Sequence, residues 1–75
     1  MKELVEFMVK SLVDNPDNLV IITEEDGDLV KIFIKADEND IGKIIGKQGK
    51  IAKAIRTIVR SSAMKLGKKV IVEIN

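Results

Sequence analysis

The chain has 75 residues, enough for one small domain, and it contains neither cysteine nor histidine, which excludes disulfides and structural zinc sites. No run of apolar residues approaches the ~18 that a membrane-spanning helix needs. The net charge of +1 combines −7 over residues 1–40 (four bases, eleven acids) with +8 over residues 41–75 (nine bases, one acid), so the second half favours a polyanionic partner.

The first predicted element is a helix from Lys2 to about Asp14. Leu4, Met8 and Leu12 recur at every fourth position, with valines beside them, which is the periodicity of one apolar helix face. Asn15-Pro16 is expected to end this helix, because a residue before proline avoids helical backbone angles.

Two strands follow at Leu19–Glu24 and Leu29–Lys35, since both segments are rich in valine and isoleucine. Asp26-Gly27 between them is typical of a two-residue hairpin turn. A turn centred there predicts three cross-strand pairs on the core face: Leu19 with Ile34, Ile21 with Ile32, and Thr23 with Val30. The other face is then expected to carry Val20, Ile22, Lys31 and Phe33.

The remaining elements are a short helix at about Asn39–Ile45, a long helix at Lys50–Leu66 and a last strand at Val70–Ile74. Asp37 and its neighbours offer capping side chains for the short helix, and Gly67 offers a stop for the long one. In the last strand the inward positions are expected to be Val70, Val72 and Ile74. The sequence therefore predicts an α+β fold in the order αββααβ.

The segment Gly42–Lys50, GKIIGKQGK, runs from within the short helix to the start of the long one and contains three glycines and three lysines. Glycine allows another backbone to approach closely, and a helix N-terminus presents unpaired N–H groups with partial positive charge. A helical wheel of the long helix predicts an apolar arc (Ile51, Ile55, Ile58, Ser62, Leu66) opposite a basic arc (Lys50, Lys53, Arg56, Arg60). This pattern indicates phosphate binding.

Two nucleotide-binding motifs fit this segment poorly. A P-loop needs four residues between its glycines and a Ser or Thr after its lysine, whereas Gly42 and Gly46 enclose three and Gln48 follows Lys47. A Rossmann fingerprint follows a strand, whereas this turn joins two predicted helices. A nucleic-acid backbone suits the spread of basic residues best.

The run from Ile45 to Ile51, IGKQGKI, resembles the I-G-x-x-G-x-x-I core of the KH domain, whose GxxG loop clamps about four single-stranded nucleotides. The order αββααβ resembles the type II arrangement. The short length and the run IGKIIGKQGKIAKAIRTIVR resemble the KhpA (YlqC) family of small bacterial RNA-binding proteins. The resemblance implies a single type II KH domain over residues 1–75, with a KH core at about 29–75 and a three-stranded sheet with its helices on one face.

The resemblance implies that single-stranded RNA is the ligand and that its backbone lies along the GxxG loop. The bases would lie in a narrow groove whose aliphatic floor comes from Ile41, Ile44 or Ile45, with the strand Val30–Lys35 as the other wall. The expected RNA-binding residues are Gly46, Lys47, Gln48, Gly49, Lys43, Lys50, Lys53, Arg56 and Ile45. Only Phe7 and Phe33 are aromatic, so an aromatic stacking platform is not expected and binding should be weak and loosely specific.

Members of the resembled family form homodimers and pair with a second RNA-binding protein of the KhpB (Jag) type. That pair is linked to RNA chaperoning and post-transcriptional regulation, and to control of cell-wall growth, peptidoglycan homeostasis and cell length. The resemblance implies the same partners and roles here. Candidate partner surfaces are the outer sheet face, where Ile71 would join Val20, Ile22 and Phe33, and the small helix residues Ala54, Thr57 and Ser61.

Other classes of function remain as alternatives. An enzyme is not expected, because no nucleophile has a base nearby in sequence, and no cofactor or metal is predicted. A helix-turn-helix DNA-binding module would also place a basic helix after a glycine turn, and a protein-interaction module could coexist with RNA binding. The acids Glu3, Glu6 and Asp14 are wrong for a secretory signal, so we expect a soluble, cytoplasmic protein without a membrane partner.

Overall fold

The computed structural model describes residues 2–75. In chain order its helices and strands are α1 (Lys2–Lys10), β1 (Val20–Asp26), β2 (Leu29–Lys35), α2 (Glu38–Ile45), α3 (Lys50–Lys65) and β3 (Lys69–Ile74). Two short 3-10 turns, η1 (Pro16–Asn18) and η2 (Lys47–Gly49), precede β1 and α3. The predicted α+β fold and the order αββααβ of a type II KH domain are confirmed.

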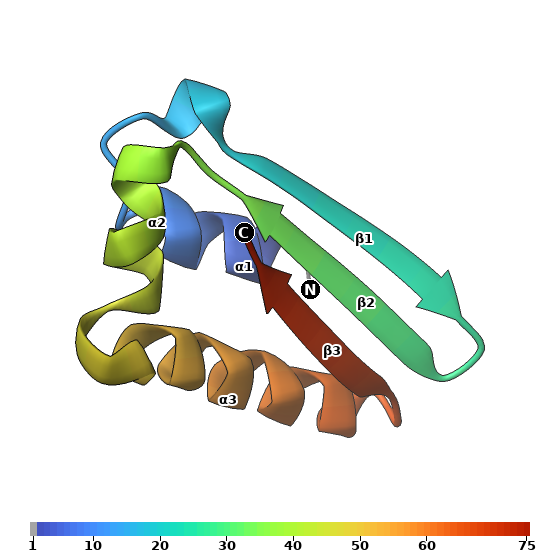
Figure 1. Cartoon of the computed structure of the whole chain (residues 1–75). Helices are drawn as coiled ribbons and strands as arrows, with labels where there is room; N and C mark the ends of the chain where they lie inside the picture. Colours follow the sequence, from blue (N-terminus) through green and yellow to red (C-terminus); the bar gives the residue numbers. More distant parts are fainter. Residues whose placement is uncertain (1) are drawn as a thin grey trace.

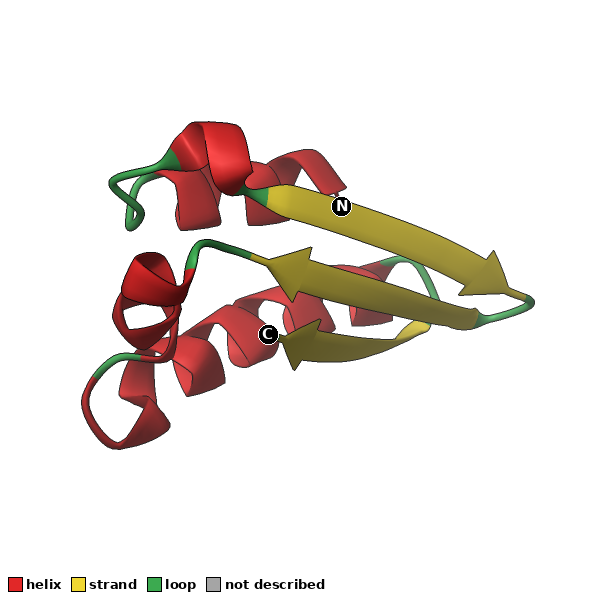
Figure 2. Cartoon of the chain, turned by 45° about the horizontal axis from the view of Figure 1, so that its top comes forward, coloured by secondary structure: helices red, strands yellow, loops and turns green. Residues whose placement is uncertain are grey.

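The three strands form one sheet in the order β1-β2-β3, in which β1 and β2 are antiparallel and β2 and β3 are parallel. A parallel pair needs a long crossover, and the α2–α3 unit supplies it. α1 and α3 pack on one face of the sheet, while α2 lies beyond the ends of β2 and β3 (Figures 1 and 2). The core between helices and sheet contains the fully buried side chains Val5, Val9, Ile32, Ile34, Ile44 and Val59.

The hairpin turn lies one residue further along the chain than predicted. Asp26 pairs with Leu29, so Gly27 and Asp28 form the turn, and Gly27 takes a φ of +62° that suits glycine. Ile21 therefore pairs with Ile34, and Thr23 pairs with Ile32. The predicted partners were wrong by two residues, but a shift of two preserves the side-chain alternation, and the predicted core face still carries Ile21, Val30, Ile32 and Ile34.

α1 ends at Lys10, four residues earlier than predicted. Its buried positions are Val5 and Val9, with Met8 and Leu12 only partly buried against the core. After Lys10 the helix tightens, because the Leu12 N–H donates to Val9 O at 3.0 Å. The chain leaves the helical path at Asp14 and Asn15, because their backbone N–H groups donate to the carboxylate of Asp40 on α2 instead.

α3 buries a row of side chains that overlaps only in part with the arc predicted by the wheel, since Ile55 is buried and Ile51 partly buried as expected. The buried residues are Ala52, Ile55, Val59 and Ala63, whereas Ile58 is 46% exposed and Leu66 lies past the helix end at 65%. In the buried row the two alanines lie on either side of the larger Ile55 and Val59. Gly67 ends the helix as predicted, with the Lys68 N–H donating to Ala63 O at 2.9 Å and the Gly67 N–H to Met64 O at 3.0 Å.

Candidate nucleic-acid interface

α2 brings the chain to the glycine-rich loop. Asp37 caps its first turn by accepting a hydrogen bond from the Asn39 N–H at 3.0 Å. Ile44 is fully buried and fixes one face of the helix in the core. The helix ends where the Gly46 N–H donates to Gly42 O at 2.8 Å. The position of the loop therefore depends on how this short helix is held.

The loop itself contains three residues with positive φ: Gly46 (+74°), Gln48 (+57°) and Gly49 (+74°). Its internal bonds begin with the Gly49 N–H, which donates to Gly46 O at 3.3 Å, and the Lys50 N–H, which donates to Lys47 O. The backbone N–H groups of Lys47 and Gln48 take no part in these two bonds, so they can donate to an acceptor outside the loop. The turn thus directs backbone donors and the N-terminus of α3 toward the same region.

The two loop glycines have different surroundings. A Cβ added at Gly46 would lie 2.5 Å from Cγ1 of Ile51, so a side chain there would collide with the core-facing side of α3. A Cβ added at Gly49 would meet nothing within 4 Å. Gly46 therefore packs against the protein, whereas the face of Gly49 is open to another molecule.

Exposed cations surround the open side of the loop. Lys47 belongs to the loop, and Lys50 and Lys53 follow on α3; all three are exposed, and none of the ion pairs found within residues 2–75 involves them. Lys43 differs from these three. Its ammonium contacts the carboxylates of Asp14 and Asp40, the latter at 3.8 Å, and the hydrogen bond to Asp14 raises the pKa of Lys43. Of the predicted basic residues, Lys43 is thus the one whose charge is already paired.

A hollow of about 180 Å³ lies between α3 and β3. The Arg56 Nε–H donates to Val72 O at 3.4 Å on the open edge of the sheet, and the lining consists of Arg56, Arg60, Val70, Ile71 and Val72. The strand that lines this hollow is β3, whereas the strand expected as the wall of the RNA groove, Val30–Lys35, belongs to β2 in the middle of the sheet. Sequence reasoning did not include Arg60 or the β3 residues in the site, although the basic arc already contained Arg60.

The three isoleucines proposed for the groove floor separate in the structure. Ile44 is fully buried within the core, Ile41 is half-buried, and Ile45 is 37% exposed next to Gly46. Ile45 and part of Ile41 are therefore accessible to a ligand, whereas Ile44 is not.

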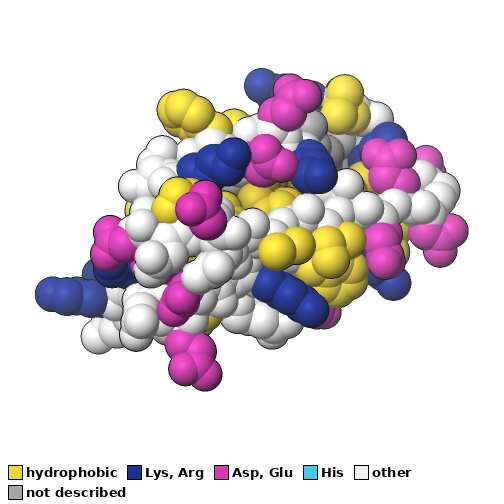
Figure 3. Space-filling view, turned by 90° about the horizontal axis from the view of Figure 1, so that it is seen from above, with side chains coloured by type: hydrophobic (Ala, Val, Ile, Leu, Met, Phe, Trp, Pro, Cys, Tyr) yellow, Lys and Arg dark blue, Asp and Glu magenta, His cyan; other side chains and the backbone are white. Residues whose placement is uncertain are grey.

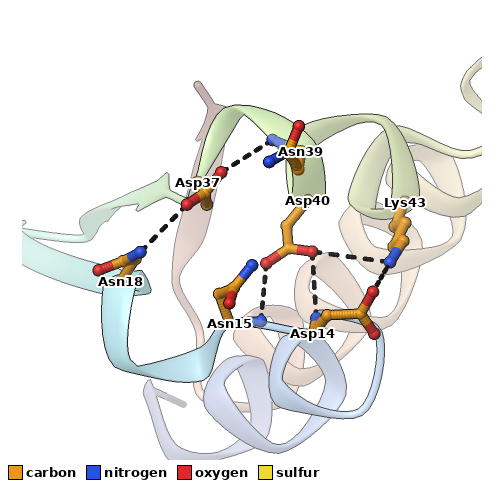
Figure 4. Close-up of polar contacts among 7 residues, drawn as sticks. All are labelled: Asp14, Asn15, Asn18, Asp37, Asn39, Asp40 and Lys43. Atoms are coloured by element: carbon orange, nitrogen blue, oxygen red, sulfur yellow. Dashed lines mark hydrogen bonds and ion pairs between the residues drawn. The ribbon is translucent and has the colours of Figure 1, made fainter.

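Asp40 is a buried carboxylate that sequence reasoning did not assign to the site. Its Oδ1 accepts the Asp14 N–H at 3.1 Å and its Oδ2 accepts the Asn15 N–H at 2.9 Å (Figure 4). These bonds and the charge of Lys43 hold the pKa of Asp40 below its usual value, against the opposite effect of burial. The spacing could have indicated it, because Asp40 lies four residues before the buried Ile44 and so on the same helix face.

The hairpin at the other end of the molecule carries several acidic side chains. The loop and the β1–β2 hairpin turn lie at opposite ends in Figures 1 and 2, and Figure 3 shows acidic groups around the hairpin end. The acids of that hairpin are Glu24, Glu25, Asp26 and Asp28. Within residues 2–75 there is no cluster of side chains suited to a metal ion, and no helix has the length and apolar character that a bilayer crossing requires.

Comparison with known proteins gives consistent matches along the chain. The sequence model of the family described as "KhpA/KhpB, KH domain" matches residues 2–74. Proteins named RNA-binding protein KhpA from Clostridium perfringens and Clostridium acetobutylicum are 50% and 46% identical over 74 residues, which cover 99% of both chains in each case. A protein of the same name from Aquifex aeolicus is 47% identical over 75 residues, covering 99% of this chain and 94% of its own. No solved structure matches the chain.

Proposed function

Since the chain belongs to the KhpA/KhpB family of KH domains, we propose that it binds single-stranded RNA through the loop Gly46–Gly49 and the groove between α3 and β3. The observation that carries this proposal is the loop geometry, in which an open glycine, free backbone donors and a helix N-terminus face the same region as three unpaired lysines. The names of the relatives, which are RNA-binding proteins, support a binding role rather than catalysis.

The RNA backbone is the part of the ligand that the loop fits. The open face of Gly49 lets a phosphate approach the main chain, and the N–H groups of Lys47 and Gln48 donate to its oxygens. The ammonium groups of Lys47, Lys50 and Lys53 supply positive charge along the expected path of the RNA strand. Lys43 contributes less direct attraction, because its charge is shared with Asp14 and Asp40.

The bases fit the hollow beside α3. Guanidinium planes stack on nucleobases, and Arg56 and Arg60 line this hollow together with the apolar side chains of Val70 and Val72. Phe33 lies on the outer positions of the sheet, paired with Ile22, so it is not next to the hollow. With aliphatic and arginine contacts alone, the chain is expected to bind weakly and to discriminate little between bases.

Salt dependence tests this function against the alternatives. The chain should bind a short single-stranded RNA with a log–log salt slope of roughly −2 to −3, since each phosphate neutralised on a single strand contributes about −0.7 and three or four contacts are expected. Duplex DNA should bind more weakly. A recognition helix needs its basic side chains free to enter the major groove, whereas Arg56 of α3 is hydrogen-bonded to Val72 O at the edge of β3. A slope near zero, or tighter binding of duplex DNA, would contradict the proposal.

We further propose, from the family relationship, that the chain acts in the cytoplasm as a homodimer and with a KhpB (Jag) type partner, in RNA chaperoning and in control of cell-wall growth and cell length. Two linked grooves would gain avidity without new contacts. The outer sheet face, with Val20, Ile22 and Ile71 each about half exposed, supports a protein contact. Sedimentation over a concentration series tests the dimer, and a monomer at high micromolar concentration would rule it out.

A further inference from the structure

Asp40 is the one buried charged residue found within residues 2–75. Burying a carboxylate is unfavourable unless its oxygens are hydrogen-bonded. Here both oxygens are bonded, to the backbone N–H groups of Asp14 and Asn15, and Lys43 lies 3.8 Å from Oδ1. The carboxylate thus ties the first turn of α2 to the connection between α1 and β1, about 25 residues earlier in the chain.

A second contact holds the same two segments together. The side chain of Asn18 donates to Oδ2 of Asp37 at 3.1 Å, while Oδ1 of Asp37 caps α2 through the Asn39 N–H at 3.0 Å (Figure 4). The start of α2 is therefore fixed at two points against residues 14–18. Both contacts lie at the N-terminal end of the helix, so together they fix the position of that end against the α1–β1 connection.

α2 transmits this constraint to the loop. The helix has eight residues, a length of about 12 Å, and its other end is Gly46. Gly46 packs closely against α3, since even one added carbon atom would approach Ile51 to 2.5 Å. A displacement of α2 would therefore shift Gly46 against Ile51 and alter its spacing to Gly49, which lies at the start of α3.

On this geometry, and resting on the proposed RNA-binding function, we infer that Asp40 is a positioning residue for RNA binding. It holds the first turn of α2 against the α1–β1 connection and thereby sets the spacing of the loop that receives the phosphates. Asp40 itself does not contact RNA, because its side chain is fully buried.

Whether Asp40→Asn weakens or strengthens RNA binding distinguishes a positioning role from an effect of net charge alone. Replacing any aspartate with asparagine removes a negative charge and should slightly strengthen binding to a polyanion. Positioning predicts the opposite for Asp40→Asn, since the new NH2 group would face a backbone N–H donor and one of the two anchoring bonds would be lost. The control is Asp17→Asn, which removes the same charge from an exposed residue of η1 in the same connection.

The experiment measures binding of both variants to one short single-stranded RNA, at a temperature where circular dichroism shows each to be folded. Asp17→Asn should bind as tightly as the unmodified chain or slightly more tightly. Asp40→Asn should bind about tenfold more weakly, a typical strength of coupling between distant sites, with an unchanged salt slope because no phosphate contact is removed. A folded Asp40→Asn variant that binds as well as Asp17→Asn would overturn the inference.

Hydrogen exchange in the unmodified chain decides the matter if Asp40→Asn does not fold. Coupling between sites is reciprocal, so RNA bound at the loop should slow exchange of the Asp14 and Asn15 amides. Protection of the Lys47–Lys50 amides without any change at Asp14 and Asn15 would overturn the positioning role alone. An unmodified chain that binds no single-stranded RNA would instead overturn the proposed function, and the positioning role with it.

Discussion

Gly46 and Gly49 share a φ of +74°, yet the structure uses them differently. The sequence predicted close backbone approach at both, and the positive φ confirms that each position favours glycine. The contacts that distinguish them come from Ile51 packing against Gly46 and from open space at Gly49, which no sequence pattern records. The left-handed conformation of Gln48 was also not predictable, because glutamine is not among the residues that favour it.

Alanine substitutions at the two glycines should therefore differ in their effect on stability. Gly46→Ala combines backbone strain with overpacking against Ile51 and should lower the free energy of unfolding by roughly 2–6 kcal/mol. Gly49→Ala carries only the left-handed penalty of about 1–2 kcal/mol, while weakening RNA binding by closing the open face. Urea unfolding of both variants measures the difference, and equal losses of stability would contradict this account of the loop.

At the scale of elements, periodicity predicted which segments form helices and strands better than it predicted their contacts. The wheel of α3 centred the apolar arc to one side of the true buried row, so it included Ile55 but left out Ala52, Val59 and Ala63. Similarly, moving the turn by one residue changes each cross-strand partner by two positions, which keeps the same side-chain alternation. The pattern therefore could not distinguish the turn at Gly27-Asp28 from the predicted one.

Truncation of two isoleucines tests the orientation of α3. Ile55 is 4% exposed, and Ile55→Ala should cost about 2–5 kcal/mol of stability through loss of burial and formation of a cavity. Ile58 is 46% exposed, and Ile58→Ala should cost no more than about 1 kcal/mol. Thermal or urea unfolding gives both values. Comparable losses at the two positions would mean that α3 is turned toward the arc predicted from the sequence.

At the scale of the whole molecule, the fold brings parts of the acidic and basic halves of the sequence together, since Lys68 pairs with Glu25 of the hairpin and Lys43 pairs with Asp14 beside α2. The longest dimension is 34 Å, with the glycine loop at one end and the acidic hairpin at the other. The charge balance of the two halves was predictable from the sequence, but these ion pairs between the halves were not. The strand that lines the hollow beside α3 was also not predictable, because strand order does not follow from periodicity, and the parallel pairing of β3 with β2 brings the last strand beside α3.

Reversing the charge of the loop tests whether the loop binds the RNA backbone. Changing Lys47 and Gln48 together to aspartate leaves both glycines in place. Aspartate tolerates the left-handed conformation at position 48, and acids near a helix N-terminus are favourable, so the fold should survive. The control changes Lys2 and Lys10 to aspartate on α1, which alters the net charge by −4 against −3 for the loop variant.

The measurement is the affinity of both variants for one single-stranded RNA, after circular dichroism has shown each to be folded. Although the control loses more positive charge, it should keep most of its binding, because long-range repulsion is screened over about 10 Å. The loop variant should lose most measurable binding, since close repulsion of a phosphate in a partly dry groove costs several kcal/mol. A folded loop variant that binds RNA as well as the control would contradict the claim that the Gly46–Gly49 loop receives the RNA backbone.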